Sequence, residues 1–156
     1  MGQEIERKFL VAQEKWGLLE KPKGEFFRQG YLLLNPEKTV RVRVTPTTGF
    51  LTIKGLTTGA TRLEYEYEIP RDEALELIDR FSVAELSKIR YRVHHGDKIW
   101  DVDEFAGENS GLVIAEIELP HEDEPFLLPD WAESEVTGEE KYYNANLTIH
   151  PFKKWL

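Results

Sequence analysis

Charged residues of one sign alternate with apolar residues along several short segments of the chain. Residues 4–11 (EIERKFLV) carry Glu4, Glu6 and Lys8 at every second position. Successive side chains of a β-strand point to opposite faces, so these three would share one face. Other segments repeat the pattern, and their alternating charged residues are Arg41, Arg43, Lys54, Arg62, Glu64, Glu66, Lys88, Arg90, Asp101, Asp103, Glu116 and Glu118.

Grouping by sign distinguishes these faces from an ordinary exposed sheet. A half-exposed antiparallel sheet commonly turns a charged face to water, but a typical surface mixes the two signs. Here EIE (4–6), RVR (41–43) and DVD (101–103) each repeat one sign. Two like charges about 6.6 Å apart repel by roughly 2 kcal/mol at an effective dielectric of about 20. The pattern indicates counter-ions: metal ions for the carboxylates, and an anion with several negative oxygens for the cations.

The elements that would position these residues are mostly strands. Segments rich in β-forming residues and bounded by Gly, Pro and Asn predict strands at residues 4–11, 25–34, 39–45, 49–56, 61–70, 85–95, 97–107 and 111–120. The short links between them favour antiparallel hairpins. Apolar residues at helical spacing predict the main helix at 71–82 and a shorter one at 13–19. The segment after Asp130 is mixed, and it predicts no definite element.

Closing eight such strands into a barrel leaves an interior just wide enough for side chains or one small ligand. We therefore expect the charged faces to point inward and the apolar faces to lie outside, under the helices and chain ends. The predicted fold is α+β: one domain over residues 1–156, built on an eight-stranded antiparallel β-barrel with flanking helices. Its centre would be a polar tunnel.

Composition limits the function classes. The chain is 40% hydrophobic and 31% charged, as in folded proteins. It contains no cysteine, which excludes disulfides, thiolate zinc sites and cysteine nucleophiles. A formal net charge of −9 disfavours nucleic acid and anionic membranes as partners. Apolar runs are too short to span a membrane and no signal peptide is evident, so we expect a cytoplasmic protein. A homodimer is compatible with the sequence, which does not fix the oligomeric state.

The order of the charged motifs resembles that of the CYTH superfamily, also called triphosphate tunnel metalloenzymes. The similarity covers nearly the whole chain. The segments closest to the short bacterial branch, which hydrolyses inorganic tripolyphosphate, are EIERKFLV (4–11), QGYL (29–32), GLVIAEIEL (111–119) and VTGEEKYYN (136–144).

This resemblance implies roles for the charged residues. Mg²⁺ or Mn²⁺ would be the cofactor, because hard cations take oxygen ligands and bridge to phosphates. The implied metal ligands are Glu4, Glu6, Glu116 and Glu118. Arg and Lys would clamp phosphate oxygens, and the implied substrate-binding residues are Lys8, Arg41, Arg43, Lys54, Arg62, Lys88 and Arg90. The implied catalytic residues, including further ligands or water-positioning groups, are Glu4, Glu6, Lys8, Glu64, Glu66, Asp101 and Asp103.

The activity implied is metal-dependent hydrolysis of tripolyphosphate to pyrophosphate and phosphate, with a small-molecule triphosphate as the partner. Phosphoryl transfer of this kind depends on positioning and charge stabilisation. Three alternatives stay open: a thiamine- or nucleoside-triphosphatase, a class IV-type adenylate cyclase, or a non-catalytic binder of polyphosphate or nucleotide. A β-domain with merely solvated charged faces is the remaining interpretation.

Several other charged residues fall outside this set. Arg7 and Arg28 alternate with the opposite face and are left out. Glu68 and Arg92 have the inward parity but lie near strand ends, so tunnel mouth and surface are equally favoured. Lys141, beside two glutamates, is expected to be exposed.

Overall fold

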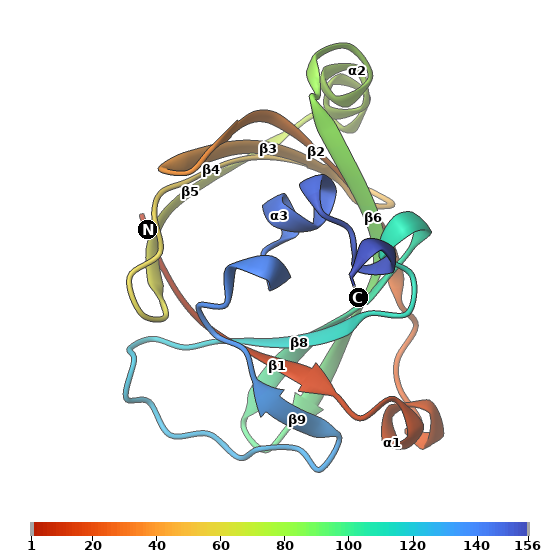
Figure 1. The fold of residues 1–156 in the computed structure, drawn as a ribbon, viewed down its shortest axis with the longest axis vertical. Helices are drawn as coiled ribbons and strands as arrows, with labels where there is room; N and C mark the ends of the chain where they lie inside the picture. The colour runs from red at the N-terminus through yellow and green to blue at the C-terminus, as the bar shows by residue number, and fades with distance from the viewer. Residues whose placement is uncertain (1, 156) are drawn as a thin grey trace.

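A ring of eight antiparallel strands closes into a barrel (Figure 1). The computed structural model describes residues 2–155. The strands are β1 (Gln3–Val11), β2 (Glu25–Asn35), β3 (Lys38–Val44), β4 (Gly49–Lys54), β5 (Thr61–Ile69), β6 (Ala84–His95), β7 (Lys98–Phe105), β8 (Val113–Glu118) and β9 (Ala132–Glu135). The α-helices are α1 (Gln13–Leu18), α2 (Arg71–Phe81) and α3 (Asn144–Ile149), and the 3-10 turns are η1 (Gly107–Asn109), η2 (Glu140–Tyr142) and η3 (Phe152–Lys154).

Strand β1 closes the barrel because it pairs with two barrel neighbours. Its first residues pair with β5, with Glu4 opposite Arg62. The following residues pair with β8, with Glu6 opposite Glu118. The C-terminal end of β1, past the residues that pair with β5, pairs with β9. The eight-stranded barrel was predicted, whereas β9 was not, because its four residues, AESE, lack the alternation of apolar and polar residues that marks a strand.

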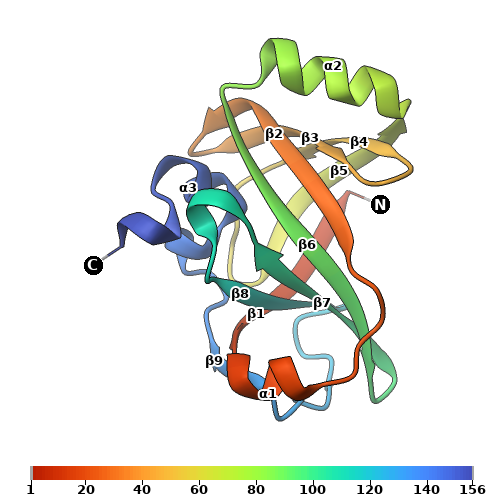
Figure 2. The same cartoon turned by 90° about the vertical axis from the view of Figure 1, so that its right-hand side faces the viewer.

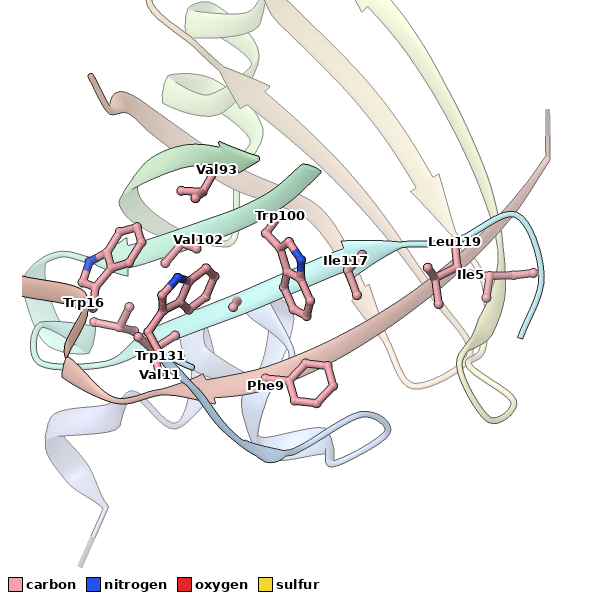
Figure 3. Close-up of a cluster of buried hydrophobic side chains, with 12 residues drawn as sticks. Ile5, Phe9, Val11, Trp16, Val93, Trp100, Val102, Ile117, Leu119 and Trp131 are labelled. Atoms are coloured by element: carbon pink, nitrogen blue, oxygen red, sulfur yellow. The ribbon is translucent and has the colours of Figure 1, made fainter. Parts of the chain in front are cut away.

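The hydrophobic core lies outside the barrel, as the inward orientation of the charged faces requires. The largest cluster covers the outer faces of β1, β7 and β8 and contains three tryptophans (Figure 3). The ring centroid of Trp131 lies 5.4 Å from that of Trp16 and 5.8 Å from that of Trp100. Both contacts are edge-to-face, an arrangement that aromatic pairs prefer. This cluster fixes the wall from which Glu4, Glu6 and Glu116 project inward.

Helix α2 covers another part of the barrel, over β2, β3 and β4 (Figure 2). Asp72 and Glu73 occupy its first turn, where carboxylates complement the helix dipole. Its buried face consists of Ala74 and Ile78, which pack on valines of β3. The helix ends before Ser82, whose hydroxyl donates to the carbonyl of Ile78 at 2.6 Å. The predicted helix at 71–82 is confirmed, one residue shorter.

The C-terminal segment lies at one mouth of the barrel. Helix α3 is seen within the ring of strands in Figure 1 and to one side of them in Figure 2. Its buried residue, Leu147, belongs to a second cluster together with Tyr142. Among residues 2–155, no helix has the length and apolar character needed to cross a membrane.

Candidate functional site

The inward faces of the strands enclose a cavity of about 470 Å³, a volume typical of small-molecule sites. Every predicted site residue except Asp103 lines it. Those residues are Glu4, Glu6, Lys8, Arg41, Arg43, Lys54, Arg62, Glu64, Glu66, Lys88, Arg90, Asp101, Glu116 and Glu118. Arg92 also lines the cavity, and its side chain is 67% exposed, which places it at a mouth.

Glu4 pairs with cations from neighbouring strands. Its carboxylate lies 3.3 Å from the ammonium of Lys54 and 3.9 Å from the guanidinium of Arg62. Lys54 also lies 3.1 Å from Glu64. Burial acts to raise the pKa of Glu4, but Lys54 and Arg62 outweigh it and lower that pKa to about 2. Glu4 is therefore ionised at neutral pH.

Arg41 and Arg43 share one carboxylate, and each has a buried N–H donor without an acceptor in the described part of the chain. Their guanidiniums lie 3.6 and 3.5 Å from Glu66. Among residues 2–155, no acceptor lies within hydrogen-bonding distance of the buried Nε atom of either arginine. Burial, together with the positive charges of Arg41 and Arg90, lowers the pKa of Arg43 to about 10. Buried donors without acceptors are costly, so this wall is suited to an anion that supplies oxygens.

Asp103 lies behind the cavity wall instead of in the cavity. It is fully buried and accepts hydrogen bonds from Lys88 at 2.8 Å and from Arg90 at 2.8 Å to each oxygen. Burial opposes ionisation of Asp103, but these two cations hold its pKa well below the usual range. Its role as a further ligand or water-positioning group stays a prediction, and both of its oxygens already accept hydrogen bonds from Lys88 or Arg90.

Glu116 and Arg90 continue the network along β8 and β6. Glu116 lies 3.6 Å from Lys8 and 3.1 Å from Arg90. Burial raises the pKa of Glu116, but Lys8 and Arg90 outweigh it and lower it below the ordinary value. Burial lowers the pKa of Lys88 to about 7, against the attraction of Asp103. Buried ions of both signs therefore line this side of the cavity.

Glu6 and Glu118 form the exception to this pairing. They are direct partners across the β1–β8 ladder, and neither makes an ion pair within residues 2–155. Burial, followed by the charges of Glu116 and Glu4, raises the pKa of Glu6 to about 8. Burial and the charges of Glu4 and Glu64 also raise the pKa of Glu118. Ionisation of these two carboxyl groups is therefore unfavourable unless a cation binds beside them.

A divalent cation fits this position. Across the described part of the chain, no three His, Asp or Glu side chains form a ready-made metal site. Mg²⁺ usually binds through one or two carboxylates while it keeps waters and bridges to substrate phosphates, so a complete protein cage is not required. The unpaired oxygens of Glu6 and Glu118 provide the donor chemistry that Mg²⁺ and Mn²⁺ prefer.

Residues of the C-terminal segment also reach the site, and sequence reasoning missed them. The ring of Tyr143 lies 5.2 Å from the ammonium of Lys8 and 5.3 Å from the guanidinium of Arg62. The side-chain oxygen of Asn144 accepts a hydrogen bond from Lys88 at 2.9 Å. Neither residue lies in an alternating charged motif. The available signal was the late segment VTGEEKYYN, which the resemblance to the family already covered.

The residues excluded on parity point away from the cavity. Arg7 pairs with Glu135 at 2.7 Å, and Arg28 pairs with Asp79 at 2.8 Å and Glu85 at 2.9 Å. These pairs are partly exposed and contribute little to stability. Lys141 is exposed, as predicted, and lies over the rings of Tyr142 and Trp155.

A closed antiparallel barrel with an interior of paired acids and bases defines the triphosphate tunnel fold. The chain belongs to the CYTH domain family, whose model matches residues 2–148. Enzymes of this kind are metal-dependent.

Similar proteins support this membership. The chain is 49% identical over 156 residues to an inorganic triphosphatase of Acetivibrio thermocellus, a match that covers 99% of each chain. It is 35% identical over 154 residues to an inorganic triphosphatase of Nitrosomonas europaea, covering 94% of this chain and 97% of that one. A crystal structure of an inorganic triphosphatase superposes with a TM-score of 0.64 at 31% identity, with 94% of each chain covered.

Proposed function

We propose that this protein hydrolyses inorganic tripolyphosphate to pyrophosphate and orthophosphate, with Mg²⁺ or Mn²⁺ as cofactor. The observation that carries the proposal is the contrast within one cavity. Within residues 2–155, Arg41 and Arg43 have buried donors without acceptors, while Glu6 and Glu118 are carboxyl groups without a paired cation. A polyphosphate that brings a divalent cation would satisfy both. Relatives named inorganic triphosphatase, at 49% and 35% identity, support this substrate.

The chain's own residues would bind and orient the phosphate groups. Arg41, Arg43 and Arg90 can each offer two N–H groups to phosphate oxygens, whereas Lys8 and Lys54 act as point charges. Glu6 and Glu118, supported by Glu4 and Glu116, would hold the cation, which when bound would lower the pKa of a coordinated water and neutralise phosphate charge. Asp103 would act indirectly, by holding Lys88 and Arg90 in place.

The reaction depends on stabilising the charge that spreads over the oxygens of the transferred phosphoryl group. Cations already fixed around the cavity can do so without reorganising during the reaction. Lys88 and Arg90 are held by Asp103, and Lys54 by Glu4 and Glu64. This fixed arrangement favours catalysis over simple binding.

The test is a comparison of initial rates of phosphate release from tripolyphosphate, pyrophosphate, ATP and thiamine triphosphate, with Mg²⁺, Mn²⁺ or EDTA present. The proposal predicts fast, metal-dependent release from tripolyphosphate and much slower release from the others. Preference for ATP or thiamine triphosphate would instead assign the chain to an organic triphosphate. Binding of tripolyphosphate without turnover in any metal would identify a binder.

A further inference from the structure

Two consecutive residues of the C-terminal segment, Tyr143 and Asn144, contact three of the cations that line the cavity. They lie where η2 leads into α3, at the barrel mouth that this segment partly covers (Figure 1). Both line the cavity and both are only partly buried. The cations they touch, Lys8, Arg62 and Lys88, come from three different strands.

Asn144 fixes the direction of the Lys88 side chain. A lysine ammonium has three N–H donors and no acceptor, so the amide oxygen of Asn144 must face it. The distances from Nζ are 2.9 Å to Asn144 and 2.8 Å to Asp103. Two of its three donors are thereby occupied, and the third has no hydrogen-bond acceptor among residues 2–155. Lys88 is 1% exposed, so the neighbouring side chains determine its orientation.

Tyr143 has a comparable position beside Lys8 and Arg62. Its ring centroid lies 5.2 Å from Nζ of Lys8 and 5.3 Å from Cζ of Arg62, within the range of cation–π attraction. These two cations repel each other, and the attraction of each to the ring offsets part of that repulsion. Lys8 and Arg62 would have more freedom of movement without the ring.

We propose that Tyr143 and Asn144 are positioning residues that hold Lys8, Arg62 and Lys88 in the conformation that binds a triphosphate. The inference rests on the proposed function and extends it, because it makes substrate affinity depend on docking of the C-terminal segment. Side chains that are ordered before binding lose less entropy when the ligand arrives. The contacts exist before substrate binds, so their loss should raise KM more than it lowers kcat.

The experiment uses the full-length protein with Asn144→Ala and Tyr143→Leu. Thr148→Ala is the matched control, because Thr148 lies on α3 and does not line the cavity. Within residues 2–155 its side chain donates one hydrogen bond, to the carbonyl of Ala145 at 2.6 Å. Steady-state kinetics on tripolyphosphate would be combined with titration calorimetry of tripolyphosphate in EDTA, which measures binding without turnover. Melting temperatures would check that each variant is folded.

We expect Asn144→Ala and Tyr143→Leu each to raise KM and to weaken binding in EDTA by about tenfold. A loss of this size is typical of one hydrogen bond to a charged group for Asn144 and of lost cation–π contacts for Tyr143. Thr148→Ala should match the wild type. Tyr143→Phe, which keeps the ring, should restore most of the affinity lost in Tyr143→Leu. In a Lys88→Met background, Asn144→Ala should have little further effect, because both changes remove the Lys88–Asn144 hydrogen bond and the other bond to this oxygen, from Gln29, is long at 3.5 Å.

Two results would overturn the inference alone. In the first, the Asn144→Ala and Tyr143→Leu variants bind and turn over tripolyphosphate as well as Thr148→Ala does. In the second, the affinity lost in Asn144→Ala adds fully to the affinity lost in Lys88→Met. A wild-type protein that neither binds nor hydrolyses tripolyphosphate would overturn the proposed function, and the inference with it. The wild-type measurements therefore separate the two failures.

Discussion

Glu6 on β1 and Glu118 on β8 face each other directly in the barrel wall, and no cation is paired with either within residues 2–155. Like charges directly opposite one another destabilise a strand pair. Every other acid of the predicted site pairs with a base, which makes this exception informative. It indicates that ionising both carboxyl groups is unfavourable in the metal-free protein, at the position where a cation would bind.

Replacing Glu6 with Gln should stabilise the metal-free protein and remove most of its response to metal and substrate. The wild type should gain several degrees in melting temperature when Mg²⁺ and tripolyphosphate are added, because ligands that bind only the native state stabilise it. Glu6→Gln should gain much less. Glu20→Gln, at an exposed position outside the cavity, should respond like the wild type. Equal gains in both variants would contradict the assignment of Glu6.

The stability of the metal-free protein should fall as pH rises from about 4.5 to about 8. The folded-state pKa of Glu6 is about 8 and its ordinary value is 4.5, so the folded state binds more protons in this window and stability decreases with pH. The loss should be about 2 kcal/mol, below the full linkage value because Glu6 is partly exposed.

Urea unfolding in EDTA between pH 5 and 9, on the wild type and on Glu6→Gln, measures this loss. The difference between the two curves isolates Glu6, since the lowered pKa of Lys88 acts in the opposite direction above pH 7. A difference that does not change with pH would contradict the raised pKa of Glu6.

Asp103→Ala should destabilise the fold by about 3 to 5 kcal/mol, because it leaves two buried cations, Lys88 and Arg90, without their carboxylate. Asp101→Ala should cost less than about 1 kcal/mol, since that side chain is 30% exposed and its ion pairs are longer. Chemical denaturation compares the two. An Asp103→Ala protein of unchanged stability but low kcat would instead support a direct catalytic role.

Arg43→Leu should weaken tripolyphosphate binding by at least about tenfold, the cost of a lost charge-assisted hydrogen bond, while leaving stability unchanged or higher. The reason is that Arg43 is buried, has an unpartnered Nε, and is repelled by Arg41 and Arg90. Calorimetric binding and melting temperature test the two halves of this prediction separately. Arg28→Leu, on the outer face of β2, should bind normally; equal loss in both variants would point to a nonspecific charge effect.

The alternation of charged and apolar residues was sufficient to predict the barrel, its inward charged faces and most of the charged side chains that line the cavity. A period of two specifies which residues share a face, and grouping by sign indicates that the face is enclosed. The orientation of Asp103 could not be predicted, because parity places it on the inner face but says nothing of how deeply Lys88 and Arg90 enclose it.

The C-terminal contributions had no comparable signal. Helix α3 has six residues and β9 has four, too few for periodicity, and both depend on tertiary contacts with the barrel. Tyr143 and Asn144 therefore emerged only from the three-dimensional arrangement. The expected cytoplasmic location, the homodimer and the choice between Mg²⁺ and Mn²⁺ stay predictions.

The central claim is that the charged cavity hydrolyses tripolyphosphate. It is tested most directly by following the substrate and products by ³¹P NMR with excess Mg²⁺, and by phosphate release with excess Mn²⁺, for the wild type and for Glu6→Gln at equal concentration. The account predicts that the wild type converts tripolyphosphate to pyrophosphate and orthophosphate in a one-to-one ratio, that EDTA stops the reaction, and that Glu6→Gln reduces the rate at least about a hundredfold. A folded wild-type protein that leaves tripolyphosphate intact with either metal, or a Glu6→Gln variant of unchanged rate, would contradict it.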